Sequence, residues 1–208
     1  CGIGIIILLQ IKPARIVKTT GETDMLEQIK KIVPQIINTK SLLTLTVTFI
    51  LFMSAYGALD EFYPLFYNDL GVPKGYMGIL GLLGYSFASL GGWLISKKSI
   101  EKKFSTNYAL LSGVFCYGGY YFTQNIWFIV LHFPLAAIFV MAEVQLQANM
   151  QKHFESSVRA TSLSVINMLK ELLVVGMTAL MGFVAVNGLW KVFGVAGGVV
   201  LIAWVASA

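Results

Sequence analysis

Six apolar stretches of about the length that crosses a bilayer, separated by short polar turns, most constrain how this chain can fold. A helix needs about 20 mostly apolar residues to cross the hydrocarbon core of a membrane. The chain is 57% hydrophobic and only 12% charged, which is far from the composition of soluble domains. We therefore expect an all-α membrane protein built as a six-transmembrane-helix bundle. The predicted spans are 42–66, 75–95, 108–122, 126–147, 161–186 and 190–208.

Two segments precede the predicted bundle of residues 42–208. Residues 1–9 are apolar and are expected to be the end of a preceding transmembrane helix, so we interpret the sequence as part of a longer protein. Residues 10–41 are more polar, and their apolar residues, among them Ile32 and Ile36, recur at helical spacing. This pattern predicts an amphipathic helix on the cytoplasmic surface, bent at Pro34.

The distribution of Lys and Arg predicts the orientation, because short cytoplasmic loops collect these residues. They concentrate in loops 10–41, 96–107 and 148–160, whereas the opposite loops hold only Lys74 and Lys191. We expect the three basic loops to be cytoplasmic and the protein to lie in the plasma membrane. The net charge of +5 then reflects topology. Nucleic-acid binding would need a basic patch on a folded surface, so we expect no such partner.

The fifth span carries two adjacent charges, Lys170 and Glu171, near its middle. A charge at the centre of a bilayer costs at least about 2.5–3.5 kcal/mol, so such charges are usually paired or face a water-filled cavity. Ser164, Asn167 and Glu171 follow one another at intervals of three and four residues, which places them on one stripe with Lys170 at its edge. We expect Glu171 to face a cavity as a substrate-binding or proton-carrying group.

The fourth span carries His132, Glu143 and Gln147 on one face. A short loop joins it to the fifth span, so the two helices are expected to be antiparallel neighbours. At about 1.5 Å per residue, Glu143 lies about 10 Å and Lys170 about 14 Å from the cytoplasmic side. Our hypothesis is that these two side chains pair, leaving Glu171 free. For His132 we favour a satisfied hydrogen bond between helices, with a proton relay as the alternative.

The first span ends at Asp60 and Glu61, for which two interpretations stand. They are ordinary residues of the membrane interface, or they line the outer mouth of a cavity where Pro64 interrupts the helix. In the second span, glycines recur every third residue from Gly75 to Gly84, and Gly91 and Gly92 follow. Small residues on one face let helices approach closely, so we expect a packing surface there, with or without a sliding motion.

Two local motifs and the overall plan resemble the C-terminal half of a Major Facilitator Superfamily transporter. The segment GWLISKKSIEKK, 92–103, is similar to the family's loop of a glycine followed by basic residues, and RATSLS, 159–164, is similar to the entry of its eleventh helix. The loop motif rests on Gly92, Lys97, Lys98, Lys102 and Lys103. Ser96 and Ser99 depart from it, standing where the family has Asp and Gly.

The resemblance implies half of a twelve-helix transporter, organised as a 3+3 inverted repeat. Residues 1–9 would then end the sixth helix, residues 10–41 would form the central loop, and the N-terminal half of the same protein would be the partner. By the same analogy, the first, second, fourth and fifth spans would line the central cavity.

The function that the sequence favours is secondary active transport of a small molecule by alternating access. No G-x-x-x-x-G-K phosphate loop is present, so an ion gradient would supply the driving force. A proton is the expected coupling ion, since desolvation favours the protonated form of carboxyl groups such as Glu171, Glu143 and Asp60. We favour drug or metabolite efflux by an antiporter, and sugar or metabolite uptake is the alternative. No cofactor or metal is expected.

A membrane-embedded protein of another class is the contrasting interpretation. An enzyme would need a ligand cluster or an activated nucleophile, and the chain has only two histidines, His132 and His153, in no metal-binding motif. A chromophore linked to Lys170, with Glu143 as its counter-ion, would be coloured. A transporter would instead show substrate flux that collapses with the proton gradient.

Overall fold

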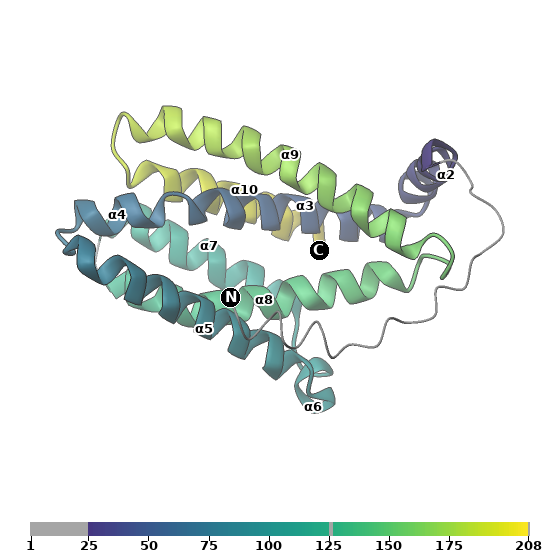
Figure 1. The fold of residues 1–208 in the computed structure, drawn as a ribbon, viewed down its shortest axis with the longest axis horizontal. Helices are drawn as coiled ribbons and strands as arrows, with labels where there is room; N and C mark the ends of the chain where they lie inside the picture. Colours follow the sequence, from purple (N-terminus) through teal and green to yellow (C-terminus); the bar gives the residue numbers. More distant parts are fainter. Residues whose placement is uncertain (1–24, 125–126, 208) are drawn as a thin grey trace, which may run out of the picture.

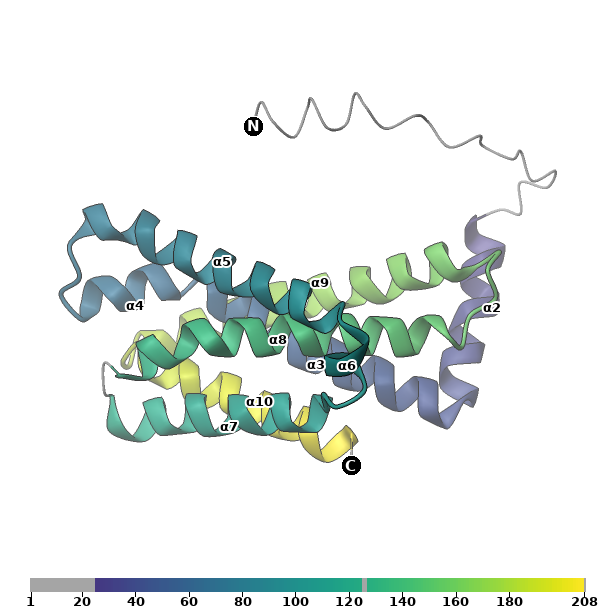
Figure 2. The ribbon, with the colours of Figure 1, turned by 90° about the horizontal axis from the view of Figure 1, so that it is seen from below.

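The apolar stretches of the chain fold as helices that lie along one common direction. The structure, a computed structural model, describes residues 25–124 and 127–207. Its helices in chain order are α2 (Met25–Asn38), α3 (Lys40–Asp60), α4 (Tyr63–Asp69), the short 3-10 helix η1 (Lys74–Tyr76), α5 (Met77–Ile95), α6 (Lys98–Glu101), α7 (Thr106–Thr123), α8 (Trp127–Gln151), α9 (Arg159–Ala185) and α10 (Lys191–Ser207). Figures 1 and 2 show an elongated bundle with α4 at one end and α2 at the other. The predicted segment 1–9 lies outside the described residues.

Several of these helices have the dimensions of membrane spans. Within 25–124 and 127–207, four are long and apolar enough to cross a bilayer, and α10 is a shorter apolar helix. The four spans are Lys40–Asp60, Lys74–Ile95, Val130–Gln151 and Arg159–Ala185. They confirm the predicted all-α membrane bundle.

The first predicted span is interrupted near its end. α3 stops at Asp60 and α4 begins at Tyr63, with Pro64 in the first turn of α4. Proline suits that position because a backbone N–H there would have no helical partner. The break turns α4 onto the bundle, where the ring of Phe66 lies 4.5 Å from Tyr120 and 4.9 Å from Phe193. The interruption is therefore observed, while the role of Asp60 and Glu61 stays a prediction.

The packing order of the long helices differs from the expectation in one respect. α3 lies at the centre, packed against α9 and α10, whereas α5 packs on α8 and α7 packs on α10 and α8. The expected neighbours α8 and α9 have few contacts with each other. A short loop fixes only the distance between helix ends, and α9 leans onto α3, where Val174 lies against Gly57. The two helices that carry the predicted charges therefore diverge.

Only part of the predicted glycine packing surface contacts another described helix. At Gly91, an added methyl group would collide with the carbonyl group of Ala137, so this glycine permits the close contact between α5 and α8. A methyl group at Gly75, Gly78 or Gly81 would meet no described atom. This part of the predicted packing surface is therefore uncovered in the described part of the chain, and the close approach occurs at Gly91, about two helical turns beyond Gly84.

The amphipathic segment forms helix α2, which lies across one end of the bundle (Figure 1). Ile32 and Ile36 are buried, while Val33 and Ile37 are exposed. The Gln35 side-chain amide donates a hydrogen bond of 2.9 Å to the carbonyl oxygen of His153, in the loop between α8 and α9. This contact fixes α2 to the same end of the bundle as that loop.

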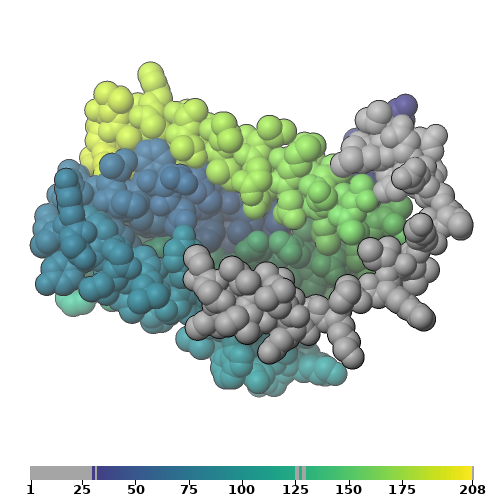
Figure 3. Space-filling view, in the orientation of Figure 1, coloured from purple at the N-terminus to yellow at the C-terminus, as the bar shows by residue number. Residues whose placement is uncertain are grey.

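The long helices differ strongly in how much of their surface is covered. α3 is mostly buried, whereas α5 and α9 are mostly exposed, although all three are apolar. On the face seen in Figure 3, α9 and α5 stand forward and α3 lies between them, set back. Large apolar side chains such as Leu82 on α5 and Val175 on α9 are more than two-thirds exposed.

Candidate functional site

Two regions of the bundle bring the predicted polar residues beside open space. The first is a cavity of about 320 Å³ near α4, which we call the aromatic pocket. Its walls come from α3, α4, α5 and α8, and its side chains with aromatic or ionisable groups are Tyr56, Asp60, Tyr63, Tyr67, Tyr85, His132 and Phe133. The helix break after α3 creates this pocket, because it turns Tyr63 and Tyr67 back toward α5 and α8.

Helical spacing places the aromatic residues of this pocket. Tyr56 and Asp60 are one turn apart on α3, and both face the pocket. Tyr63 and Tyr67 are one turn apart on α4, with ring centroids 6.1 Å apart in a stacked arrangement. Asp60 lies close enough to the hydroxyl groups of Tyr56 and Tyr67 for its charge to act on both. The carboxyl group thus lies beside aromatic rings and is itself exposed.

His132 lies at the inner wall of the pocket and is 8% exposed. Its ring centroid is 3.9 Å from that of Tyr63. Its Nδ1 atom has no hydrogen-bond partner among the described residues. The expected hydrogen bond to a neighbouring helix is therefore not found at this atom, since the facing surface of α4 offers an aromatic ring there.

A second, water-sized cavity of about 10 Å³ lies behind His132. Tyr63 and Tyr117 contribute to its walls, and their hydroxyl groups lie close together without forming a hydrogen bond of good geometry. A cavity of this size holds about one water molecule. Tyr117 is almost fully buried, so it belongs to the core and not to an aromatic belt at the membrane surface.

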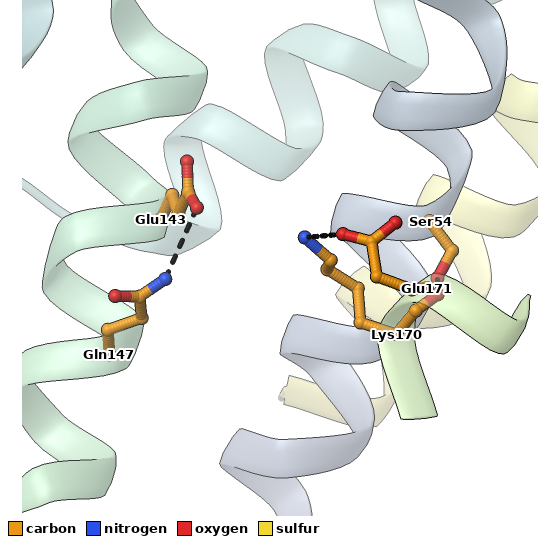
Figure 4. Close-up of polar contacts among 5 residues, drawn as sticks. All are labelled: Ser54, Glu143, Gln147, Lys170 and Glu171. Carbon is orange, nitrogen blue, oxygen red and sulfur yellow. Dashed lines mark hydrogen bonds and ion pairs between the residues drawn. The ribbon is translucent and has the colours of Figure 1, made fainter. Parts of the chain in front are cut away.

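The second region, the central charged group, consists of Glu143 and Gln147 on α8 with Lys170 and Glu171 on α9 (Figure 4). The Lys170 ammonium group forms an ion pair with Glu171, with 2.7 Å between Nζ and Oε1. The Gln147 amide donates a 3.2 Å hydrogen bond to Glu143 within its own helix. The hypothesis of an ion pair between Glu143 and Lys170 is therefore wrong for this conformation, because α8 and α9 diverge.

Lys170 nevertheless remains directed toward Glu143. Figure 4 shows its ammonium group extending from α9 toward the carboxylate on α8, across the space beside α3. Its charge is near enough to act on Glu143. The exposed fractions of the paired side chains are 18% for Lys170 and 65% for Glu171, so the carboxylate is the more accessible member.

Ser54 is a residue of this region that sequence reasoning did not identify. It is fully buried on α3, and its hydroxyl group donates a 3.1 Å hydrogen bond to the main-chain oxygen of Lys170. The bond fixes α9 to α3 at the level of the charges. A small hydroxyl residue one turn before Gly57, in the apolar middle of α3, was the available signal.

The remaining candidate residues differ in how exposed their side chains are. On α9, Asn167 is half-buried and Ser164 is exposed. Glu61 and the adjacent Asp60 are both exposed, but only Asp60 lines the aromatic pocket.

The basic loop motif forms the junction from α5 through α6 toward α7. Lys97, Lys98, Lys102 and Lys103 are all exposed, and Gly92 is half-buried within α5. The Lys97 ammonium lies 4.6 Å from the ring centroid of Trp93, an arrangement that holds this lysine beside the helix end.

The family sequence model of the Major Facilitator Superfamily matches residues 1–177, most of the chain. The chain therefore belongs to this family, and it is a multi-pass membrane protein of the transporter class. No curated protein and no solved structure matches it.

Proposed function

We propose that the chain is one half of a secondary active transporter that moves a small molecule across the plasma membrane by alternating access. The observation that carries this proposal is the central charged group. Charged side chains lie in the middle parts of two apolar helices that diverge from each other, and charges inside a membrane are usually held there for function. A purely structural ion pair would serve best between packed helices.

The partner in this proposal is the N-terminal half of the same protein. α5 and α9 expose apolar side chains and, on α5, a row of uncovered glycines. Both helices lie on one face of the bundle, on either side of α3 (Figure 3). A second helical half placed on this face would enclose the central charged group and the aromatic pocket between the two halves.

The arrangement of charges supports proton coupling as part of this proposal. Glu171 is the accessible carboxylate and is paired with Lys170. The charge of Lys170 also acts on Glu143. Protonation of Glu171 would release Lys170 to reach Glu143, so a single proton would switch the partner of the lysine. Asp60 in the aromatic pocket is a second carboxyl group that a substrate and a proton could occupy in turn. This exchange suits an antiporter that exports its substrate.

The experiment uses the full-length protein reconstituted in liposomes with a pH-sensitive dye. Addition of a transported compound to vesicles with an imposed proton gradient should dissipate that gradient, and Glu171→Gln should remove the effect. Lys152→Met, which alters an exposed lysine in the loop after α8, is the control and should behave as the unaltered protein. Substrate flux that continues unchanged after the gradient is collapsed would contradict proton coupling.

Uptake of sugars or other polar metabolites is the second candidate. It would use the same fold, and the panel of compounds in the liposome experiment should include them. The largely apolar and aromatic walls of the pocket near α4 favour amphipathic compounds over sugars.

A further inference from the structure

The aromatic pocket combines features that together indicate the chemistry of its ligand. Five aromatic side chains, from four different helices, line it: Tyr56, Tyr63, Tyr67, Tyr85 and Phe133. The face of an aromatic ring carries partial negative charge and attracts cations within about 6 Å of its centroid. Walls of this kind suit a ligand that is both apolar and positively charged.

The formal charge of the pocket wall also favours a positively charged ligand. Asp60 is the acidic residue of the lining, and no Lys or Arg among the described residues contributes to it. Asp60 is exposed at the pocket wall, and a carboxylate beside an apolar surface attracts a cation more strongly than one in bulk solvent. An anionic ligand would meet both the carboxylate and the negative ring faces.

A third feature is the unpaired nitrogen of His132. This side chain is more than nine-tenths buried, lines the pocket, and leaves Nδ1 without a partner within the described residues. Buried polar atoms nearly always have hydrogen-bond partners, so this nitrogen at the junction of the pocket and the water-sized cavity behind it indicates a place for a water molecule. In the neutral ring such a nitrogen can accept a hydrogen bond from that water.

We propose that the aromatic pocket binds an organic cation, a protonated or quaternary amine attached to an apolar body. Asp60 neutralises the charge, and the tyrosine and phenylalanine rings of the pocket wall contact it. The volume of about 320 Å³ is at the small end of ligand sites, so it accommodates the charged head and one ring of such a compound. The inference rests on the proposed function, for which it names the substrate class.

The binding experiment compares three soluble probes that share one ring and differ in charge. Benzyltrimethylammonium, benzyl alcohol and benzenesulfonate are titrated into the purified full-length protein in detergent, and heat is recorded. The cation should bind at least about tenfold more tightly than the neutral and anionic compounds. Equal affinities for all three would overturn the proposal.

Variants of neighbouring residues locate the site. Asp60→Asn should weaken binding of benzyltrimethylammonium at least about tenfold, whereas Glu61→Gln, next to it but outside the pocket, should leave binding unchanged. Retained affinity in a folded Asp60→Asn protein would contradict the assignment.

Tyr85 provides an independent test, because it is 70% exposed and its replacement leaves the core intact. Tyr85→Ala should weaken binding about three- to thirtyfold, whereas Tyr85→Phe, which keeps the ring, should preserve it. If both variants bind alike, the rings do not hold the cation and the proposal fails.

The outcomes separate this inference from the proposed function. A protein that moves neutral compounds with a proton gradient but does not bind benzyltrimethylammonium remains a transporter and loses the cation site. A protein that binds the cation in an Asp60-dependent manner, yet moves no compound across a membrane, keeps the site and loses the transport function.

Discussion

The aromatic pocket and the central charged group lie in the same bundle but are built in opposite ways. The pocket has a single carboxyl group among the described residues of its wall, and rings that contact one another hold its shape. The central group has three formal charges on two helices that diverge, with one ion pair between adjacent residues of the same helix. A wall of packed rings is suited to recognition, whereas charges with a choice of partners are suited to switching.

The comparison also indicates how the two regions are connected. α8 carries His132 in the pocket and Glu143 in the central group, eleven residues apart and near three full turns along one face. A shift of α8 against α3 or α9 would therefore act on both regions together. This connection makes the following variants informative.

Loss of Lys170 should produce the largest difference between the regions. Lys170→Met removes the partner of Glu171 and the cation that faces Glu143, so proton-driven flux in liposomes should fall at least about tenfold. Titration with benzyltrimethylammonium should still show binding in the aromatic pocket.

The double variant Glu143→Gln with Lys170→Met completes this test. Full proton-driven flux in the double variant would show that the central charged group has no role in coupling. An equal loss in binding and flux would show that the two regions cannot be separated by function.

Gly91→Ala should affect both regions, because it forces α5 away from α8. Helix α8 carries residues of the aromatic pocket and of the central charged group. The added methyl group collides with the carbonyl group of Ala137, and overpacking of this kind costs about 1–3 kcal/mol of unfolding free energy. Unfolding of the purified protein by titration with a denaturing detergent measures the change. Gly118→Ala on α7, which meets no described atom and lies away from the α5 and α9 face, should be neutral or stabilise by up to about 1 kcal/mol, through helix propensity alone. Equal effects of the two variants would contradict the close contact at Gly91.

Ser54→Ala should have the smallest effect and should be confined to the central group. The substitution removes the hydrogen bond to the Lys170 main-chain oxygen, worth about 1 kcal/mol. The same unfolding measurement should show a smaller change for Ser86→Ala, whose exposed hydroxyl bonds within its own helix. A change in cation binding by Ser54→Ala would show that α3 transmits an effect from the central group to the pocket.

The elements that the sequence predicted well are those defined by local pattern. The apolar spans, the amphipathic helix around Ile32 and Ile36, and the break before Pro64 all depend on residues close in sequence. Backbone hydrogen bonds must be satisfied within a membrane, so a long apolar stretch has few alternatives to a helix. Family membership was also accessible, through the charge distribution and the loop motif.

The predictions about the sites depended on which helices touch, and here the sequence was less informative. Glu143 and Lys170 were placed at similar depths from helical rise, but depth does not determine the lateral distance between α8 and α9. The aromatic pocket was missed because Tyr56, Tyr63 and Tyr85 come from separate helices, and each alone resembles an ordinary residue of the membrane interface.

The sequence by itself determined the helices, their lengths and the positions of the charges along them, because helical periodicity and apolar length are properties of one segment at a time. Only the tertiary structure decided that α9 leans on α3, that Lys170 pairs with Glu171, and that aromatic residues of four helices line one pocket with Asp60. These outcomes depend on the fit between surfaces far apart in the chain, where a glycine such as Gly91 sets how closely two helices approach.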